Sequence, residues 1–260
     1  MKTIQSRDNP LFKELKKLAG SARQRGKSGQ ALLDGVHLVR ACLDAGLQPQ
    51  HIVVSRSAAG DAEVAALLDG LTGVPVASLD DALFAELTEL KTPTGVLALI
   101  ARPQPAVRAT DSQYALLLET IQDPGNLGSM IRSAAAAGCD AVFLSGDCAD
   151  AWSPRVLRAG MGGHFVLSIN ESADLLATAT DFAGRCHAAT LTAGDSLYGC
   201  DLRGRVAFAI GNEGAGLSRA LQQACRIFTI PMPGKVESLN AAAAAAVCLF
   251  EANRQRANAS

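Results

Sequence analysis

The sequence lacks the features typical of membrane, secreted and metal-binding proteins. It has no run of about 18 consecutive apolar residues, which argues against a membrane-spanning helix. Its N-terminus carries cationic side chains but no apolar stretch of secretory length. The seven cysteines are an odd number without a C-x-x-C pair, and the four histidines lack metal-site spacing. We therefore expect a cytoplasmic protein that binds no metal and whose cysteines are small buried hydrophobes.

Several enzyme motifs are also missing. The dinucleotide fingerprint G-x-G-x-x-G, the phosphate loop G-x-x-x-x-G-K-[ST] and the hydrolase motif G-x-S-x-G do not occur. Their absence argues against a nucleotide-dependent oxidoreductase and against an α/β hydrolase. Aromatic residues make up only 4% of the chain, so Phe12, Phe84 and Trp152 give no base-stacking signature.

What the chain does have is a large apolar fraction and an uneven distribution of charge. Apolar residues make up 48% of the 260 residues, enough for a buried core. The net charge is −1, yet residues 1–30 carry eight basic side chains against two acidic ones. This basic N-terminal arm suits contact with phosphates, and a solvated helix face explains its charge equally well.

Strands alternate with helices along both halves of the chain, which predicts an α/β fold. Residues 102–113 contain two prolines and several polar residues and are typical of a linker. The predicted domains are residues 1–105 and 114–260, joined by a linker at 106–113. In the second half we expect a mostly parallel sheet with helices on both faces. The strands predicted there are 114–119, 141–145, 165–169, 186–191, 205–211 and 226–232, and the helices are 127–138, 154–163, 173–182, 218–224 and 238–255.

Ligands of such sheets gather at the carboxyl ends of the strands, where two glycine-containing loops have unusual compositions. In DPGNLGSMIRSA (123–134), Asn126 can cap the following helix and Arg132 lies about one and a half turns along it. In GNEGAGLS (211–218), three glycines allow close approach of the backbone to a ligand, and packing does not explain Glu213. Each loop alone is also compatible with an ordinary turn or helix cap.

A third loop, IPMPGKVESLN (230–240), precedes a run of six alanines. Ser238 is a candidate N-cap for the last helix, and Asn240 in its first turn can point back at the other loops. In combination, DPGNLGSMIRSA, AIGNEGAGLS and IPMPGKVESLN resemble the three motifs of the SpoU (TrmH-like) family of RNA 2′-O-ribose methyltransferases, in the SPOUT superfamily. RAGMGGHFVLSI (158–169) is similar to the family's helix-glycine-strand connection. LLDGVHLVRACLDAG is similar to the start of the substrate-binding domain that many members carry.

The resemblance implies a fold, a cofactor and an oligomeric state. The family's catalytic domain is an α/β fold with a deep trefoil knot, here preceded by a smaller α/β substrate-binding domain. Its knotted loops bind S-adenosylmethionine, largely through backbone groups. Members form homodimers through this domain, to which the terminal helix with Ala241 to Ala246 contributes. The residues expected to bind the cofactor are Thr190, Leu191, Gly211, Asn212, Gly214, Ile230, Met232, Ser238 and Leu239.

The resemblance also implies the reaction, which is methyl transfer to a ribose 2′-oxygen of structured RNA. The catalytic residues carried over are Asn126, Arg132, Glu213, Ser238 and Asn240. The family proposal makes the arginine the base, but guanidinium groups have a pKa above about 12. Binding the phosphate beside the target ribose suits Arg132 better, while Asn126, Glu213 and Ser238 position it and the ribose.

The N-terminal domain is then expected to hold the RNA. The side chains predicted to contact RNA are Lys13, Lys16, Lys17, Arg23, Arg25, Lys27 and Arg132. The two-domain layout favours ribosomal over transfer RNA as the substrate. A catalytically silent RNA-binding factor on the same fold is the rival hypothesis, and it predicts the loss of Arg132 or Asn240, both of which are present.

Overall fold

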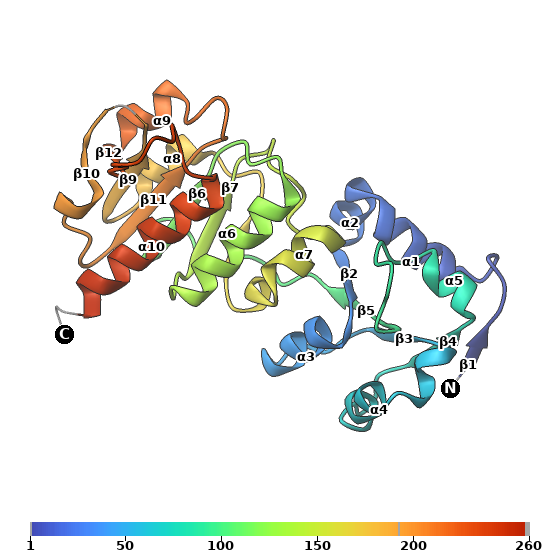
Figure 1. Ribbon diagram of the computed structural model, residues 1–260. Helices are drawn as coiled ribbons and strands as arrows, with labels where there is room; N and C mark the ends of the chain where they lie inside the picture. The colour runs from blue at the N-terminus through green and yellow to red at the C-terminus, as the bar shows by residue number, and fades with distance from the viewer. Residues whose placement is uncertain (1, 192, 258–260) are drawn as a thin grey trace. The chain divides into compact units, whose positions relative to one another are not determined.

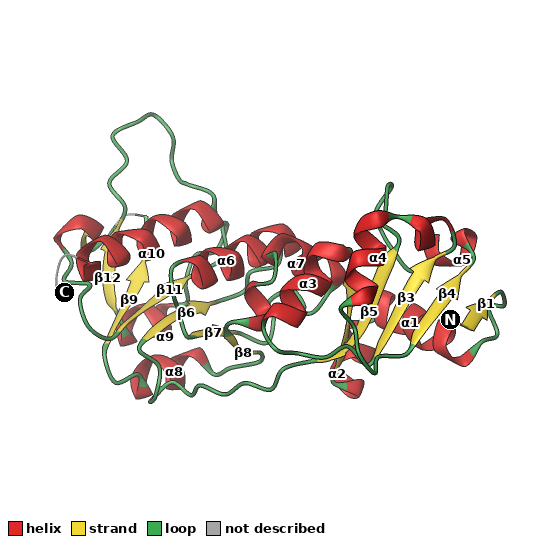
Figure 2. Ribbon diagram, turned by 90° about the horizontal axis from the view of Figure 1, so that it is seen from below, coloured by secondary structure: helices red, strands yellow, loops and turns green. Residues whose placement is uncertain are grey.

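The computed structural model describes residues 2–191 and 193–257, which form two compact units (Figure 1, Figure 2). Unit 1 contains the residues up to Pro103 together with Trp152–Phe165. Unit 2 contains Gln104–Ala151 and the residues from Val166 onward. Among the described residues, no helix is long and apolar enough to cross a membrane, and no three His, Cys, Asp or Glu side chains gather as a metal site.

Unit 1 is built on a five-stranded mixed sheet in the order β1-β4-β3-β5-β2. β4 runs parallel to β1 and β3, whereas β5 runs antiparallel to β3 and β2. The strands are β1 (Lys2–Ile4), β2 (Gln30–Asp34), β3 (His51–Ser55), β4 (Val76–Leu79) and β5 (Val96–Ala101). The helices are α1 (Pro10–Gly20), α2 (Ala22–Ser28), α3 (Val36–Asp44), α4 (Ala62–Asp69), α5 (Asp81–Ala85) and α7 (Pro154–Gly160), with 3₁₀ turns η1 (Ser57–Gly60) and η2 (Gly163–Phe165).

The basic N-terminal segment is a folded part of unit 1. β1 pairs with β4 at the edge of the sheet. The side chain of Asn9 caps α1 by accepting two backbone N–H groups of its first turn. α1 then buries Phe12, Leu15 and Leu18 in the core of the sheet. β1 and α2, with three and seven residues, are too short for a hydrophobic period to predict them.

The prediction that Arg25 of α2 contacts RNA is wrong, because this residue is buried. Arg25 is only 4% exposed. The guanidinium donates to the backbone carbonyl oxygens of Leu18 and of Ala19, the latter at 3.2 Å. These carbonyls belong to the last turn of α1, where a cation is favourable. Arg25 therefore stabilises the α1–α2 corner, a role that charge counting cannot distinguish from phosphate binding.

Helix α7 belongs to unit 1, although the chain on both sides of it belongs to unit 2. Its Arg158 pairs with a carboxylate oxygen of Glu89 at 3.1 Å and lies 3.8 Å from a carboxylate oxygen of Asp34 in β2. Burial raises the pKa of Asp34, and the hydrogen bond from Thr88 opposes this shift. The sequence predicted this helix as part of the second domain, residues 114–260. A sequence pattern gives the order of the elements but not the sheet on which each one packs.

Unit 2 is built on a seven-stranded sheet in the order β10-β12-β9-β11-β6-β7-β8. All of its described strand pairs are parallel, which confirms the predicted sheet. The strands are β6 (Tyr114–Leu118), β7 (Ala141–Leu144), β8 (Ser168–Asn170), β9 (Arg185–Ala189), β10 (Asp195–Ser196), β11 (Val206–Ile210) and β12 (Arg226–Thr229). The helices are α6 (Pro124–Ala136), α8 (Leu175–Asp181), α9 (Arg219–Ala224) and α10 (Ala241–Ala257), with the 3₁₀ turn η3 (Leu197–Gly199).

Helices cover both faces of this sheet, as predicted (Figure 1). α6 and α10 lie side by side on one face. There, the hydroxyl of Tyr114 in β6 donates to the backbone carbonyl of Leu249 in α10 at 2.6 Å. α8 and α9 cover the other face, where Leu175 and Leu221 join the core. The trefoil knot implied by the resemblance stays a prediction.

Helix α10 begins later than predicted and has a different cap. It starts at Ala241 rather than at Ser238. The side-chain oxygen of Asn240 accepts the backbone N–H groups of Ala242 at 2.9 Å and Ala243 at 3.2 Å. Serine and asparagine are equally good caps, so residue type alone cannot locate the first turn.

His187 of β9 is a buried imidazole, and neither of its nitrogens has a hydrogen-bond partner in the described part of the chain. Its ring lies beside two phenylalanine rings of β11 and β12. Burial lowers the pKa of His187 to about 4, aided by the charges of Arg226 and Arg185 and opposed by Asp201. The folded state therefore disfavours the protonated imidazole.

This low pKa predicts a loss of stability in acid. The unfolded chain binds a proton near pH 6.5, whereas folded His187 does so only near pH 4, so the stability of unit 2 falls as the pH drops from 6.5 towards 4. Between pH 7 and pH 4.5 the expected loss is about 2 kcal/mol. Hydrogen exchange of the β9 and β11 amides measures it. His187→Leu should remove this part of the pH dependence, and an unchanged pH profile would contradict the assignment.

Candidate active site

The three unusual loops meet at the carboxyl edge of the parallel sheet in unit 2. Sheet pairing places β12, β9, β11 and β6 next to one another. Neighbouring parallel strands end at the same edge, so the segments that follow them are brought together. Those segments are 119–123, 190–194, 211–218 and 230–240.

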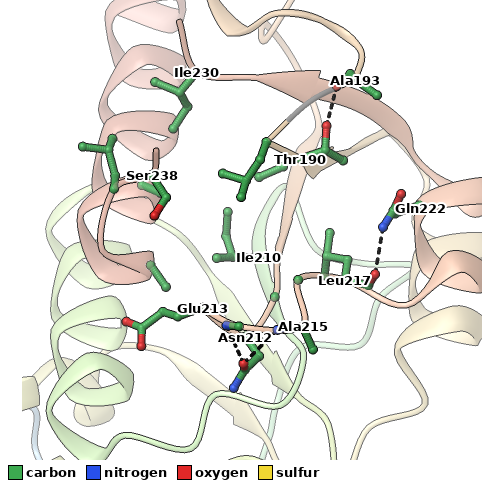
Figure 3. Close-up of a pocket in the computed structure, with 18 of the residues that line it drawn as sticks. Thr190, Ala193, Ile210, Asn212, Glu213, Ala215, Leu217, Gln222, Ile230 and Ser238 are labelled. Carbon is green, nitrogen blue, oxygen red and sulfur yellow. Dashed lines mark hydrogen bonds between the residues drawn. The ribbon is translucent and has the colours of Figure 1, made fainter. Parts of the chain in front are cut away.

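A cavity of about 300 Å³ opens among the segments that follow β9, β11 and β12. In Figure 3, Ile210 lies in the middle of the view, between Ser238 on one side and Leu217 on the other. The nine residues predicted to bind the cofactor all line this cavity, and their contact with it stays a prediction. They are Thr190, Leu191, Gly211, Asn212, Gly214, Ile230, Met232, Ser238 and Leu239.

The cavity walls combine apolar side chains with backbone groups. Apolar lining comes from Ile210, Leu217, Ile230, Met232 and Leu239. This combination suits a ligand that has a flat apolar part and polar edges, and the volume is at the lower end for small-molecule sites.

Thr190, at the end of β9, supports the cavity wall. Its hydroxyl donates to the backbone carbonyl of Ala193 (Figure 3). Its backbone N–H donates to the carbonyl of Phe228 at 2.9 Å. These bonds fold the segment after β9 back against β12. Much of the hydrogen-bonding capacity of Thr190 is thus already used within the protein, which leaves neighbouring backbone groups to bind a ligand.

The loop 211–218, which we call the glycine loop, requires a glycine at its first position. A Cβ atom on Gly211 would lie 2.3 Å from the carbonyl carbon and oxygen of Gly216, and 2.5 Å from the backbone nitrogen of Leu217. The side-chain oxygen of Asn212 accepts the N–H groups of Gly214 at 2.8 Å and Ala215 at 3.2 Å. The loop therefore closes tightly on itself beside the cavity.

Three predicted catalytic residues form one hydrogen-bonded group. Asn126 donates its amide hydrogen to a carboxylate oxygen of Glu213. The amide nitrogen of Asn240 lies 3.0 Å from that same oxygen and 3.0 Å from the side-chain oxygen of Asn126. One residue comes from each motif, and Asn126 and Asn240 are 114 positions apart in sequence. We call this group the Asn–Glu–Asn cluster.

Asp123, rather than Asn126, caps helix α6. Its carboxylate oxygen accepts the backbone N–H of Asn126 at 2.8 Å, and Pro124 occupies the first helical position. Since Asp123 satisfies this N–H group, the side chain of Asn126 is available to reach Glu213. The alternative hypothesis that Asn126 is an ordinary helix cap is therefore wrong.

Arg132 and Ser238 lie outside the Asn–Glu–Asn cluster. Arg132 is exposed, six residues beyond Asn126 on α6, a rise of about 9 Å. Within the described part of the chain it has no hydrogen-bond or ion-pair partner, and it does not line the cavity. Ser238 lines the cavity but has no hydrogen bond to the cluster among the described residues.

Sequence reasoning missed several residues of this site. Gln222 lines the cavity and donates to the backbone carbonyl of Leu217 at 2.8 Å (Figure 3). Gly194, just beyond the cavity wall, has φ +100°, and a Cβ there would meet the backbone oxygen of Ile227 at 2.4 Å. The signal for Gly194 was its position shortly after a predicted strand. Gln222 lies on a helix and gives no comparable signal.

Two family models match the chain. The model of the SpoU rRNA Methylase family matches residues 113–250. The model of the MRM3-like substrate binding domain matches residues 9–98.

Curated relatives match nearly the full length. The chain is 32% identical to the Bacillus subtilis 23S rRNA (guanosine(2553)-2'-O)-methyltransferase RlmP, over 96% of this chain and 98% of that protein. It is 30% identical to the Mus musculus mitochondrial rRNA methyltransferase 3, over 89% of this chain and 69% of that protein.

A solved structure shares the fold over both units. The SpoU methyltransferase AviRb from Streptomyces viridochromogenes, in complex with the cofactor AdoMet, has a TM-score of 0.84 at 27% identity. The match covers 95% of this chain and 98% of that one.

Proposed function

We propose that the chain, which belongs to the SpoU rRNA methylase family, methylates ribosomal RNA beside the Asn–Glu–Asn cluster. It is an S-adenosylmethionine-dependent RNA ribose-2′-O-methyltransferase. The observation that carries the site assignment is this cluster, in which Asn126 and Asn240 both bind Glu213, a residue that lines the cavity. The relatives named above support ribosomal RNA as the substrate, since both bear names of rRNA methyltransferases.

The cavity fits the cofactor. Its apolar walls suit an adenosyl group, and the backbone of the glycine loop and of Thr190, Leu191 and Ala193 can bind the polar edges. When bound, S-adenosylmethionine supplies an already activated methyl group. The protein then has to orient the 2′-hydroxyl towards it and accommodate one proton.

Glu213 is the residue best placed to orient the hydroxyl. One of its carboxylate oxygens accepts from both Asn126 and Asn240. The other has no hydrogen-bond partner within the described residues and can accept from a ribose hydroxyl. The two asparagines thus fix the carboxylate, and Ser238 contributes to the wall of the cavity on which the ribose approaches.

Arg132 has a different task from the cluster. Its exposed guanidinium is free of internal partners in the described part of the chain, so its five donors are available to a phosphate. Binding the phosphate next to the target ribose would restrict the nucleotide to one orientation. Arg132 need not lose a proton in this role.

The RNA-binding surface of unit 1 is smaller than the charge count suggested. Lys13 pairs with Asp8 at 2.8 Å, and Lys16 lies 3.3 Å from a carboxylate oxygen of Glu86. Lys17, Arg23 and Lys27 of α1 and α2 are exposed and have no ion-pair partner among the described residues. We propose that these three, which we call the α1–α2 cations, contact RNA phosphates.

Reversing the α1–α2 cations in the full-length chain tests this proposal. Lys17→Glu, Arg23→Glu and Lys27→Glu together should weaken RNA binding at least about 10-fold and reduce the slope of log K against log salt by about 2–3. S-adenosylmethionine affinity should not change. Filter binding at several salt concentrations measures the RNA affinity. Reversing three exposed acidic residues of unit 1, Asp44, Glu63 and Asp69, to lysine is the control. Equal effects on the slope in magnitude and sign would contradict the assignment.

We also propose that the protein is a homodimer in the cytoplasm. The outward face of α10 carries small and apolar side chains beside Phe250, which is 50% exposed. An apolar surface of this kind on a helix suits a second copy of the chain.

Methyl transfer from radiolabelled S-adenosylmethionine to unmodified ribosomal and transfer RNA tests the function. The RNA is then digested to nucleosides. Label in a 2′-O-methylated nucleoside of ribosomal RNA is the expected result. Label in transfer RNA would contradict the substrate, and label on a base would contradict the position of the methyl group.

A further inference from the structure

Two consecutive residues at the end of β6, Glu119 and Thr120, hold both ends of the glycine loop. At the far end of the loop, the backbone N–H of Ser218 donates to a carboxylate oxygen of Glu119 at 2.6 Å. At the near end, the side-chain amide of Asn212 donates to the backbone carbonyl of Thr120 at 3.0 Å. Hydrogen bonds therefore attach both ends of the glycine loop to the residues that follow β6.

Thr120 adopts an unusual backbone conformation that a neighbouring loop supports. Its φ is +58°, a left-handed value that is unfavourable for a β-branched residue. Its hydroxyl donates to a carboxylate oxygen of Asp147 at 2.7 Å, and its backbone N–H donates to the hydroxyl of Ser145 at 2.9 Å. Hydrogen bonds from Ser145 and Thr120 lower the pKa of Asp147. Asp147 thus holds Thr120 in the conformation that directs its carbonyl at Asn212.

Asn212 transmits this constraint into the loop. Its amide nitrogen is held by Thr120, while its side-chain oxygen accepts from Gly214 and Ala215. Glu213 lies between these residues, so the position of its carboxylate depends on how the loop is held. Neither Glu119 nor Asp147 lines the cavity, and neither belongs to the Asn–Glu–Asn cluster.

We infer that Glu119, Thr120 and Asp147 are positioning residues for methyl transfer, which fix the glycine loop and its Glu213 from the adjacent strand ends. The inference rests on the proposed roles of the loop and of Glu213. It assigns to these three residues a function in cofactor binding and turnover that they exert without touching the reacting groups. A displacement of about 1 Å in a catalytic group can cost about 100-fold in rate.

The first experiment compares Glu119→Ala with Glu119→Gln in the full-length protein. The alanine variant should bind S-adenosylmethionine about 10-fold more weakly and lower kcat by about 10- to 100-fold. Gln keeps an acceptor for the N–H of Ser218 and should restore both to within about 3-fold. Calorimetry gives the cofactor affinity, initial rates on ribosomal RNA give kcat and KM, and thermal unfolding is recorded separately.

Asp181→Ala is the matched control, because Asp181 is an exposed carboxylate on α8 with no partner among the described residues. Kinetic constants of Glu119→Ala equal to those of Asp181→Ala would overturn the inference, even if its melting temperature fell. Arg132→Ala is measured alongside. If that variant is inactive while Glu119→Ala is normal, the positioning role fails and the proposed function stands. If the wild type transfers no methyl group, the proposed function itself fails.

A double-mutant cycle tests the hydrogen bond between Thr120 and Asp147. Thr120→Ala and Asp147→Ala both remove the hydrogen bond between these two side chains, and Asp147→Ala also removes the one from Ser145, so the double variant should be no more impaired than Asp147→Ala alone. Thr120→Ser keeps the hydroxyl and should retain activity. Effects that simply multiply would show that the two residues act independently, contrary to the inference.

Discussion

Arg132→Ala is expected to lower kcat/KM for methyl transfer by about 1,000-fold or more while leaving S-adenosylmethionine affinity unchanged. This loss corresponds to about 4 kcal/mol of transition-state stabilisation. The reason is the position of Arg132, which is exposed, lacks an internal partner in the described part of the chain and does not line the cavity. Its removal should therefore affect the RNA ribose and phosphate but not the cofactor. Label transfer and calorimetry measure the two quantities separately.

Two further variants make this result specific. Arg132→Lys keeps the charge but not the planar pair of donors, so it should recover only a small part of the activity. Near-normal activity of Arg132→Lys would contradict the role in bidentate phosphate binding. Arg203→Ala serves as the control, because Arg203 is an exposed arginine that precedes β11, at the opposite edge of the sheet. It should transfer methyl groups at the wild-type rate.

Gly211→Ala is expected to abolish detectable S-adenosylmethionine binding, and with it methyl transfer. The added methyl group would lie 2.3 Å from the backbone of Gly216 and 2.5 Å from that of Leu217, so the glycine loop would have to open. Backbone atoms cannot yield as a flexible side chain can. An opened loop would move Asn212 and Glu213 away from the cavity. We expect at least about a 100-fold loss of affinity, measured by calorimetry.

The matched control for Gly211→Ala is Gly199→Ala in the same unit. A Cβ atom on Gly199 meets nothing within 4 Å, and its φ is not in the left-handed region. This variant should bind the cofactor as the wild type does. Normal binding by Gly211→Ala, with circular dichroism unchanged, would mean that the loop does not form the cofactor site.

Much of the site could be predicted from sequence because its motifs are local. Loop composition after each strand indicated Asn126, Glu213 and Asn240, and the rule that parallel strands end at one edge predicted that they meet. Elements with a clear hydrophobic pattern, such as the buried strands of unit 2, were also predicted. The family resemblance supplied the cofactor and the reaction, which no periodicity carries.

The sequence by itself thus determined the family, the reaction and the residue types of the site, since these depend on short motifs. The tertiary structure decided which partner each side chain finds. It placed α7 in unit 1, directed Arg25 to the end of α1 and made Asn240 both helix cap and member of the cluster. Hydrogen bonds join residues far apart in sequence, and burial depends on all neighbours at once. Neither is encoded in any single stretch of the chain, so Glu119 and Asp147 became visible only when the strands were assembled.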